Sequence, residues 1–261
     1  MAVHKDQAVV VRTYDLGEAD RIVTFCAAQN GRLSVVARGA RKPRSRLAAS
    51  LQLFNVGELV FFKKANRDLH YINTFDVSHP FGVRMRDPLH IAYASHLAQT
   101  ADAAGLENNP NPDLFNLLRS ALSAASNAAS VGRARRIARS FEAKLLNLLG
   151  YRPRLGGCVV CRRPLERGDV SIGLRLGGAL CKRHERNDQT VVVGEKALNA
   201  ARRLSETPFA EAAAAPLGRR EQLELKRLYL LLLSERLERK WTASEYIDAL
   251  ESGMNENTPL C

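Results

Sequence analysis

The sequence lacks the features that would place it in a membrane or among disulfide-rich secreted proteins. No apolar run approaches the roughly 20 residues that a membrane-spanning helix needs, and the longest, Leu228 to Leu233, is far shorter. The first residues show no basic start, apolar stretch and small-residue cleavage site of a signal peptide. Only five cysteines occur, and an odd number argues against a disulfide framework. We therefore expect a cytoplasmic protein with no membrane partner.

Signatures of catalysis are also missing. The sequence contains no phosphate-binding G-x-x-x-x-G-K-[ST], no G-x-S-x-G and no H-E-x-x-H. Glu18 and Asp20 form a close acidic pair, which a turn between two strands explains equally well. Cys26 lies in an apolar segment and is expected to be a buried thiol. We therefore expect that the protein is not an enzyme.

Acidic residues are few compared with basic ones. Lys and Arg number 39 and Asp and Glu 27, which gives a formal net charge of +12 and favours polyanionic partners such as nucleic acid. Between positions 32 and 67 a single acidic residue, Glu58, stands among nine basic ones. The candidate DNA-binding residues of this stretch are Arg32, Arg38, Arg41, Lys42, Arg44, Arg46, Lys63, Lys64 and Arg67. The loop from Gly39 to Arg46 would contact phosphates in a salt-sensitive and sequence-independent way, although a merely solvated cationic surface has the same composition.

Aromatic residues make up only 6% of the chain, yet several lie near this basic stretch. Some could stack on the bases of a single strand, while the alternative for most is a place in the core. They are Tyr14, Phe54, Phe61, Phe62 and Tyr71. A second basic cluster could extend the path of DNA, or could be a solvated helix face. Its candidate DNA-binding residues are Arg135, Arg136 and Arg139.

The first 80 residues have the pattern of short β-strands. Segments rich in Val, Ile, Phe and Tyr are separated by turn signals, of which Asn30-Gly31 is the strongest. The expected strands are 7–14, 20–27, 31–40, 56–65 and 69–78. Five short antiparallel strands suit a small Greek-key barrel of the OB type, and an SH3-like barrel would give much the same pattern.

The pattern changes to helical spacing from Pro88 onward. In the clearest helix, 131–149, apolar residues fall on one stripe, and Ser130 and Gly150 suit its start and its end. Three arginines of this helix, at positions 135, 136 and 139, lie away from the stripe. The other expected helices are 88–104, 113–129, 194–205, 219–240 and 243–251.

Four residues between these helices have the spacing of a metal site. Cys158-x-x-Cys161 is followed after nineteen residues by Cys181-x-x-His184. Two such tight turns can place four thiolate or imidazole ligands around a tetrahedral ion, and the residues between them can form a small hairpin. We expect one structural Zn²⁺ per chain, since all four positions are filled by side chains. Free thiols with an incidental histidine are the alternative.

Two stretches of the sequence carry motifs in a specific order and spacing. One runs from Tyr14-x-x-Gly17-Glu18-x-Asp20-Arg21-Ile22 through Gly31 to Gly39-Ala40-Arg41-Lys42 and Ser45-Arg46-Leu47. The other contains Phe141-Glu142, Leu145-Leu146 and Leu149-Gly150-Tyr151-x-Pro153 before Cys158, and continues to Gly177-Gly178-x-x-Cys181. Together these stretches resemble the RecO family of recombination mediators. One departure is His184, because the family usually has cysteine there. Imidazole is a competent zinc ligand, so the metal prediction stands.

The resemblance implies an OB-fold domain, a helical domain and an inserted zinc finger. It further implies binding to single- and double-stranded DNA, annealing of complementary strands, and partnership with RecR and the single-stranded-DNA-binding protein SSB, so that RecA is loaded onto coated DNA. A location at the nucleoid within the cytoplasm would follow. Two alternatives remain: a zinc-containing protein-interaction scaffold and a metal-dependent nuclease.

The expected fold is therefore α+β and multidomain, with an N-terminal small β-barrel (OB-fold) followed by an all-α domain that contains an inserted zinc-finger module. The expected domains are an OB-fold DNA-binding domain at 1–80, a helical domain in two parts at 81–153 and 187–250, a zinc-finger module at 154–186 and a disordered tail at 251–261.

Overall fold

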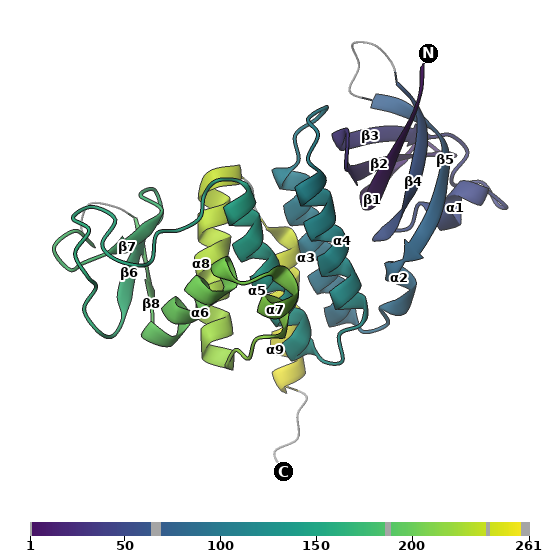
Figure 1. The fold of residues 1–261 in the computed structure, drawn as a ribbon. Coiled ribbons are helices and arrows are strands. Elements are labelled where there is room, and N and C mark those ends of the chain that lie inside the picture. Colours follow the sequence, from purple (N-terminus) through teal and green to yellow (C-terminus); the bar gives the residue numbers. More distant parts are fainter. Residues whose placement is uncertain (1, 64–68, 186–188, 239–240, 257–261) are drawn as a thin grey trace. The chain divides into compact units, whose positions relative to one another are not determined.

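The computed structural model describes residues 2–63, 69–185, 189–238 and 241–256 (Figure 1). The chain divides into two compact units: residues 1–129 with 242–261 form unit 1, and residues 130–241 form unit 2. No helix in these described ranges is long and apolar enough to cross a membrane.

Unit 1 begins with a closed five-stranded barrel. Its strands are β1 (Ala2–Leu16), β2 (Asp20–Ala27), β3 (Gly31–Ala37), β4 (Asn55–Lys63) and β5 (Leu69–Pro80). The strand order is β1-β2-β3-β5-β4, with β1 paired to β4 to close the barrel. Among the described strands of the barrel, β3 and β5 form the one parallel pair. This order, together with five strands in about 80 residues, confirms the expected OB-type barrel.

Alternating side chains fill the barrel interior. Val23, Phe25 and Leu33 belong to its buried core, as the period of two along each strand requires. The turn at Asn30-Gly31 is closely covered by the segment after the third helix. Gly31 has φ +65°, and a Cβ built there would lie 2.2 Å from the carbonyl oxygen of Asn109. Glycine is therefore required at this position both for its backbone conformation and for space.

Five helices complete unit 1 in the part of the chain that is described. They are α1 (Arg46–Ser50), α2 (Phe81–Arg84), α3 (Pro88–Ala104), α4 (Pro112–Ser126) and α9 (Thr242–Glu256). Asp87 caps α3, accepting from the backbone N–H of Leu89 at 2.7 Å. The C-terminal helix α9 packs on α3, where Tyr93 donates to Glu251 at 2.6 Å. It runs to Glu256, so the expected tail at 251–261 is helical in its first residues.

Unit 2 combines helices with a small sheet. Its helices are α5 (Val131–Leu148), α6 (Glu195–Glu206), α7 (Phe209–Ala214) and α8 (Arg219–Leu237). The antiparallel sheet has the order β7-β6-β8, formed by β6 (Val170–Gly173), β7 (Gly178–Leu180) and β8 (Thr190–Val193). The helices expected to form one domain thus belong to two units, because α3, α4 and α9 group with the barrel and α5 to α8 with the sheet.

Candidate nucleic-acid surface and candidate metal centre

The basic loop after β3 is held against the barrel at its base. The backbone N–H of Gly39 donates to Asp20 at 2.8 Å, and the Arg41 guanidinium donates to the carbonyl oxygen of Gly17 at 2.6 Å. Arg41 also pairs with Asp15 at 3.3 Å. These contacts attach the loop to the β1–β2 turn, so its position on the barrel is defined.

Beyond this base, three cations of the loop extend into solvent. Lys42, Arg44 and Arg46 are exposed, and within the described residues no hydrogen bond or ion pair engages their side chains. Arg38 is also exposed, and it lies over the ring of Tyr71 with 4.5 Å between its Cζ atom and the ring centroid. The loop therefore offers phosphate groups several cations that no carboxylate neutralises.

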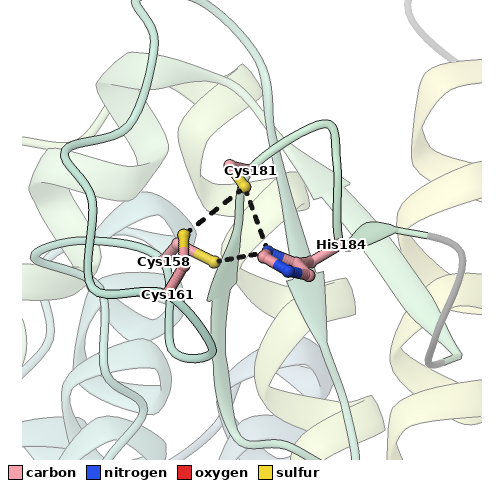
Figure 2. Close-up of side chains that lie close together, drawn as sticks. All are labelled: Cys158, Cys161, Cys181 and His184. Carbon is pink, nitrogen blue, oxygen red and sulfur yellow. Dashed lines mark hydrogen bonds between the residues drawn. The ribbon is translucent and has the colours of Figure 1, made fainter.

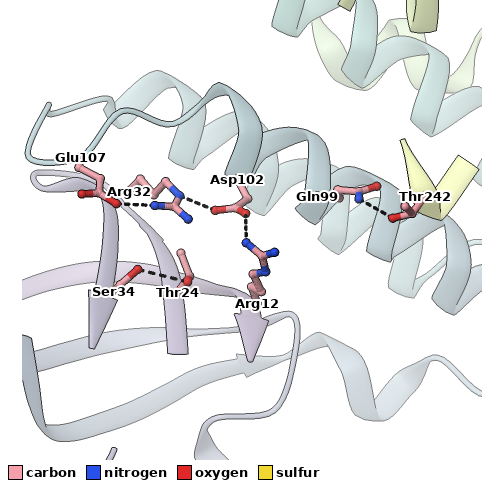
Figure 3. A network of polar contacts seen from close by, with 8 residues as sticks. All are labelled: Arg12, Thr24, Arg32, Ser34, Gln99, Asp102, Glu107 and Thr242. Carbon is pink, nitrogen blue, oxygen red and sulfur yellow. Dashed lines mark hydrogen bonds and ion pairs between the residues drawn. The ribbon is translucent and has the colours of Figure 1, made fainter. Parts of the chain in front are cut away.

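Arg32 has a different environment from the one expected. Its guanidinium donates to Asp102 of α3 at 2.7 Å and also pairs with Glu107 (Figure 3). Burial opposes the charged form, but the hydrogen bond to Asp102 and the nearby carboxylates raise the pKa of Arg32. Its charge is thus neutralised within unit 1, so Arg32 differs from the exposed cations of the loop, which have no carboxylate partner among the described residues. Lys63 is half-buried, and Lys64 and Arg67 lie outside the described residues.

The second basic cluster is also divided. Arg135 and Arg136 are half-buried on α5. Arg139 is only 3% exposed and pairs with Glu142 at 2.6 Å. The expectation that Arg139 lies away from the buried stripe is wrong. Helices α6, α7 and α8 pack on α5, and the face of α5 that they bury is wider than its apolar stripe. A guanidinium enclosed in this way is not available to DNA.

The nearby aromatic residues divide between the core and the surface. Phe54 and Phe61 are buried, at 4% and 0% exposure, and cannot stack on a base. Tyr14 is 48% exposed, while Phe62 and Tyr71 are half-buried. The sequence reading missed Arg12, whose Cζ atom lies 6.0 Å from the centroid of the Tyr14 ring. Strand alternation could have indicated it, since residues two apart on a strand share a face.

The four predicted metal ligands converge at one end of the small sheet of unit 2 (Figure 2). Cys158, Cys161, Cys181 and His184 place their ligand atoms within 4.8 Å of one another. Cys158 is buried, and the other three are half-buried. Each pair lies on a tight turn, in which the N–H of Arg162 donates to the carbonyl of Cys158 and that of His184 to the carbonyl of Cys181, both at 2.8 Å.

The spacing of these atoms suits a tetrahedral ion. The Sγ atoms of Cys161 and Cys181 are 3.9 Å apart, and His184 Nδ1 lies 3.3 Å from Cys181 Sγ and 3.5 Å from Cys158 Sγ. Zinc bonds of about 2.3 Å to sulfur and about 2.0 Å to nitrogen would place such ligands roughly 3.5 to 3.8 Å apart. The group can therefore hold one metal ion with four side-chain ligands.

The environment of the first turn also favours a thiolate. Burial opposes ionisation of Cys158, but backbone N–H groups of Cys161, Cys181 and Val160 donate to its sulfur and lower its pKa to about 6. Burial and the neighbouring Cys158 sulfur raise the pKa of Cys181. The Cys158 sulfur thus ionises more readily than an ordinary thiol, and the thiolate is the form that binds a metal cation.

Short backbone contacts position this group on the sheet. The segment before the first turn pairs with β7, because the N–H of Ala179 donates to the carbonyl of Arg154 and the N–H of Val159 to the carbonyl of Ala179, both at 2.8 Å. A Cβ on Gly178 would lie 2.7 Å from the Arg154 carbonyl oxygen. Gly178 is therefore needed for the close approach of the two segments.

Comparisons with known proteins find similarity to one family over nearly the whole chain. The family models described as Recombination protein O N terminal and C terminal match residues 1–81 and 85–245. The DNA repair protein RecO of Anaeromyxobacter dehalogenans (strain 2CP-C) is 32% identical over 243 residues, which cover 93% of this chain and 94% of that protein. The RecO of Desulforamulus reducens is 34% identical over 182 residues, 70% of this chain and 69% of its own. With its barrel, its helices and its cysteine-histidine cluster, the chain belongs to the RecO family of DNA repair proteins.

Proposed function

We propose that this protein is a DNA-binding recombination mediator and not an enzyme. It binds single- and double-stranded DNA, anneals complementary strands and, with RecR, helps to load RecA onto SSB-coated DNA. It acts in the cytoplasm, at the nucleoid. Membership of the RecO family supports this role.

The observation that carries the proposal is the exposed cationic loop on the barrel. Lys42, Arg44 and Arg46 extend into solvent without a carboxylate partner among the described residues, while Arg41 fixes the base of the loop. Cations on such a loop contact phosphates and release counterions, which gives affinity without sequence preference. The same surface would screen two anionic strands from each other, so that complementary bases can meet.

The metal in this proposal is zinc, one ion per chain, and its role is structural. Three sulfurs and one imidazole nitrogen supply four ligands, which is the number that a closed tetrahedral site uses. Bound zinc would join the two tight turns at the end of the sheet and stabilise unit 2. Because no ligand position is left for water or substrate, this arrangement favours the mediator over the metal-dependent nuclease.

Fluorescence anisotropy of labelled single- and double-stranded oligonucleotides, measured over a salt series, tests the proposal. The wild-type protein should bind both, and its affinity should fall steeply with salt. Replacing Arg41, Lys42, Arg44 and Arg46 with Ala should weaken binding to every sequence and slow strand annealing. A matched control replaces the same number of exposed arginines elsewhere, at positions 84, 86, 167 and 219.

The control variant has the same net charge as the loop variant, so a purely global charge effect would weaken both equally. Equal loss in the two variants would therefore contradict a localised site. Failure of the folded wild-type protein to bind DNA at low salt would overturn the proposal and would favour the interaction scaffold.

A further inference from the structure

Two sulfurs of the metal group face each other across the two tight turns. Cys161 lies on the first turn and Cys181 on the second, and their Sγ atoms are 3.9 Å apart (Figure 2). Because a disulfide needs about 2.05 Å between its sulfurs, each sulfur would have to move by roughly 0.9 Å. Small rotations about the Cα–Cβ bonds produce such a movement. The pair is therefore placed to form a covalent bond between the same two turns that a metal ion would join.

Solvent reaches this pair more readily than the other two cysteines of the described residues. Cys161 and Cys181 are half-buried, whereas Cys158 and Cys26 are 1% and 5% exposed. Backbone N–H groups also donate to the Cys158 sulfur, and a sulfur whose negative charge is stabilised in this way is a weaker nucleophile. An oxidant that arrives from solvent therefore meets Cys161 and Cys181 first.

Exposed cations directly follow the two cysteines in the sequence. They are Arg162 and Arg163 after Cys161, and Lys182 and Arg183 after Cys181. Lys182 pairs with Glu166 at 3.0 Å, but the two side chains are 80% and 69% exposed, so that solvent screens this pair. The hydroxide or alkoxide that leaves a hydroperoxide carries negative charge, which such cations stabilise. The surroundings of the pair therefore favour attack of a sulfur on a peroxide bond.

We infer that Cys161 and Cys181 are a site of reversible oxidation by hydroperoxides, at which a disulfide replaces the bound metal ion. The inference rests on the zinc site of the proposed function and adds a modification to it. A sulfur that binds a metal is a thiolate, which is the form that reacts with peroxides. The remaining two ligands, Cys158 and His184, cannot complete a tetrahedral zinc site, so the ion leaves when the disulfide forms.

The reaction consists of two displacements at sulfur and oxygen. One thiolate of the pair attacks hydrogen peroxide, takes one oxygen as a sulfenic acid and releases hydroxide. The second thiolate attacks the sulfenic sulfur, forms the S–S bond and displaces the oxygen as a second hydroxide. Two protons from solvent convert both hydroxides to water. The two sulfurs are oxidised by two electrons in total, and the peroxide is reduced by the same two electrons.

The oxidised turns stay attached to the sheet but lose part of their support. The N–H of Val159 still donates to the carbonyl of Ala179 at 2.8 Å, which holds the first turn on β7. The disulfide joins the two turns at one point only, whereas four ligands join them in the zinc-bound form. Oxidation should therefore lower the melting temperature of unit 2 without separating the two turns.

Peptide mapping of the zinc-loaded protein after treatment with hydrogen peroxide tests this inference. Free thiols are blocked, and trypsin then places Cys158 and Cys161 in the peptide 155–162 and Cys181 in the peptide 176–182. A cross-link between these two peptides should appear, and its fragmentation should place the bond on Cys161. One zinc ion, measured with a colorimetric chelator, should be released for each cross-link. Dithiothreitol with added zinc should reverse both changes.

Two variants control for the other cysteines and for the partner sulfur. Cys26→Ala/Cys261→Ala keeps only the cysteines of the metal group and should release zinc at the wild-type rate. Cys181→His keeps four ligands but removes the partner sulfur, so it should bind zinc and release it severalfold more slowly in peroxide. Release at the wild-type rate from the Cys181→His variant would contradict the assigned pair.

The remaining outcomes separate this inference from the proposed metal site. A disulfide within the peptide 155–162, or zinc that stays bound in peroxide, overturns the inference and leaves the metal site intact. Zinc release that is accompanied only by sulfinic or sulfonic acids, which dithiothreitol does not reduce, also overturns it. A protein that contains no zinc before peroxide is added instead refutes the proposed metal site, and the inference with it.

Discussion

Arg32 of β3 donates from Nε to Asp102 of α3 at 2.7 Å, which joins the barrel to the helix that covers it. Both side chains are largely buried, at 21% and 14% exposure. Glu107 contacts the same guanidinium, and the backbone N–H of Arg32 donates to the carbonyl of Leu106 at 3.0 Å. Residues from two distant parts of the sequence therefore hold barrel and helix together within unit 1.

Asp102→Asn should destabilise the protein because it leaves the Arg32 charge with less compensation in a half-buried position. Charge-assisted hydrogen bonds of this kind contribute about 1.5 to 3 kcal/mol, and the remaining contact with Glu107 places the expected loss at the lower end. Urea denaturation followed by circular dichroism measures it.

A surface pair provides the control for this prediction. Lys5 and Glu58 pair at 3.1 Å, but their side chains are 67% and 41% exposed. Because solvent screens such pairs, Glu58→Gln should change the free energy of unfolding by less than about 1 kcal/mol. Equal effects of the two substitutions would show that the Arg32–Asp102 pair has no special structural role.

The long elements of the fold could be predicted from the sequence because their signals are local. Segments rich in Val, Ile, Phe and Tyr between turn signals located all five barrel strands, and the helix expected at 88–104 has those bounds in the structure. The start of β1 was missed because His4, Lys5 and Asp6 do not read as strand residues, although they pair with β4. Short elements such as α1, α2 and α7 span six residues or fewer and leave little periodicity to detect.

Tertiary grouping could not be predicted in the same way. Helix α9 joins unit 1 through contacts such as Tyr93–Glu251 between residues 158 positions apart, and no local pattern reports such a pairing. The metal ligands were found because tight turns and ligand chemistry impose a fixed spacing. The cationic residues were only partly distinguished, because composition does not show that Arg32 meets Asp102 or that Arg139 meets Glu142.

Single substitutions within the basic loop should separate phosphate contacts from structural ones. Arg44→Ala removes a cation with no partner among the described residues. On a single strand the affinity should then fall less steeply with salt, and the magnitude of the slope of log K against log salt should decrease by about 0.7. Arg41→Ala also removes contacts with Gly17 and Asp15, so it should lower thermal stability as well. Anisotropy titrations and thermal melts of both variants check this, and an unchanged salt slope for Arg44→Ala would exclude it as a phosphate contact.

Loss of one metal ligand should release zinc and loosen unit 2. Cys158→Ser should reduce the zinc content from one ion per chain toward zero and lower the melting temperature, because binding free energy of the ion contributes to folding. Zinc released by denaturation is quantified with a colorimetric chelator. Cys26→Ala serves as the control, since Cys26 is buried in unit 1 and should not affect the metal. Retention of stoichiometric zinc by Cys158→Ser would contradict the assigned ligand set.

The Cys26 thiol should be unreactive in the folded protein. Burial, with smaller effects of Asp102 and Asp6, raises the pKa of Cys26 from 9.0 to about 12. The thiol is the form that folding favours, so its contribution to stability is complete below pH 9 and is lost as the pH rises toward 12. In the zinc-loaded protein a thiol reagent at pH 8 should therefore label Cys26 only after denaturant is added, as peptide mapping by mass spectrometry would show. Rapid labelling of Cys26 without denaturant would contradict this prediction.

The buried pair of Arg139 and Glu142 should contribute to the stability of unit 2 and not to DNA binding. The side chains are 4% and 0% exposed, and the atoms approach to 2.6 Å. Glu142→Ala leaves a buried guanidinium without its carboxylate, and breaking a buried pair in this way destabilises by about 3 to 5 kcal/mol. Replacing both residues, as Arg139→Met with Glu142→Leu, removes both charges and should recover much of this loss. The folded double variant should bind DNA with the wild-type salt dependence. A salt dependence that is weaker than that of the wild type would instead show that Arg139 contacts DNA.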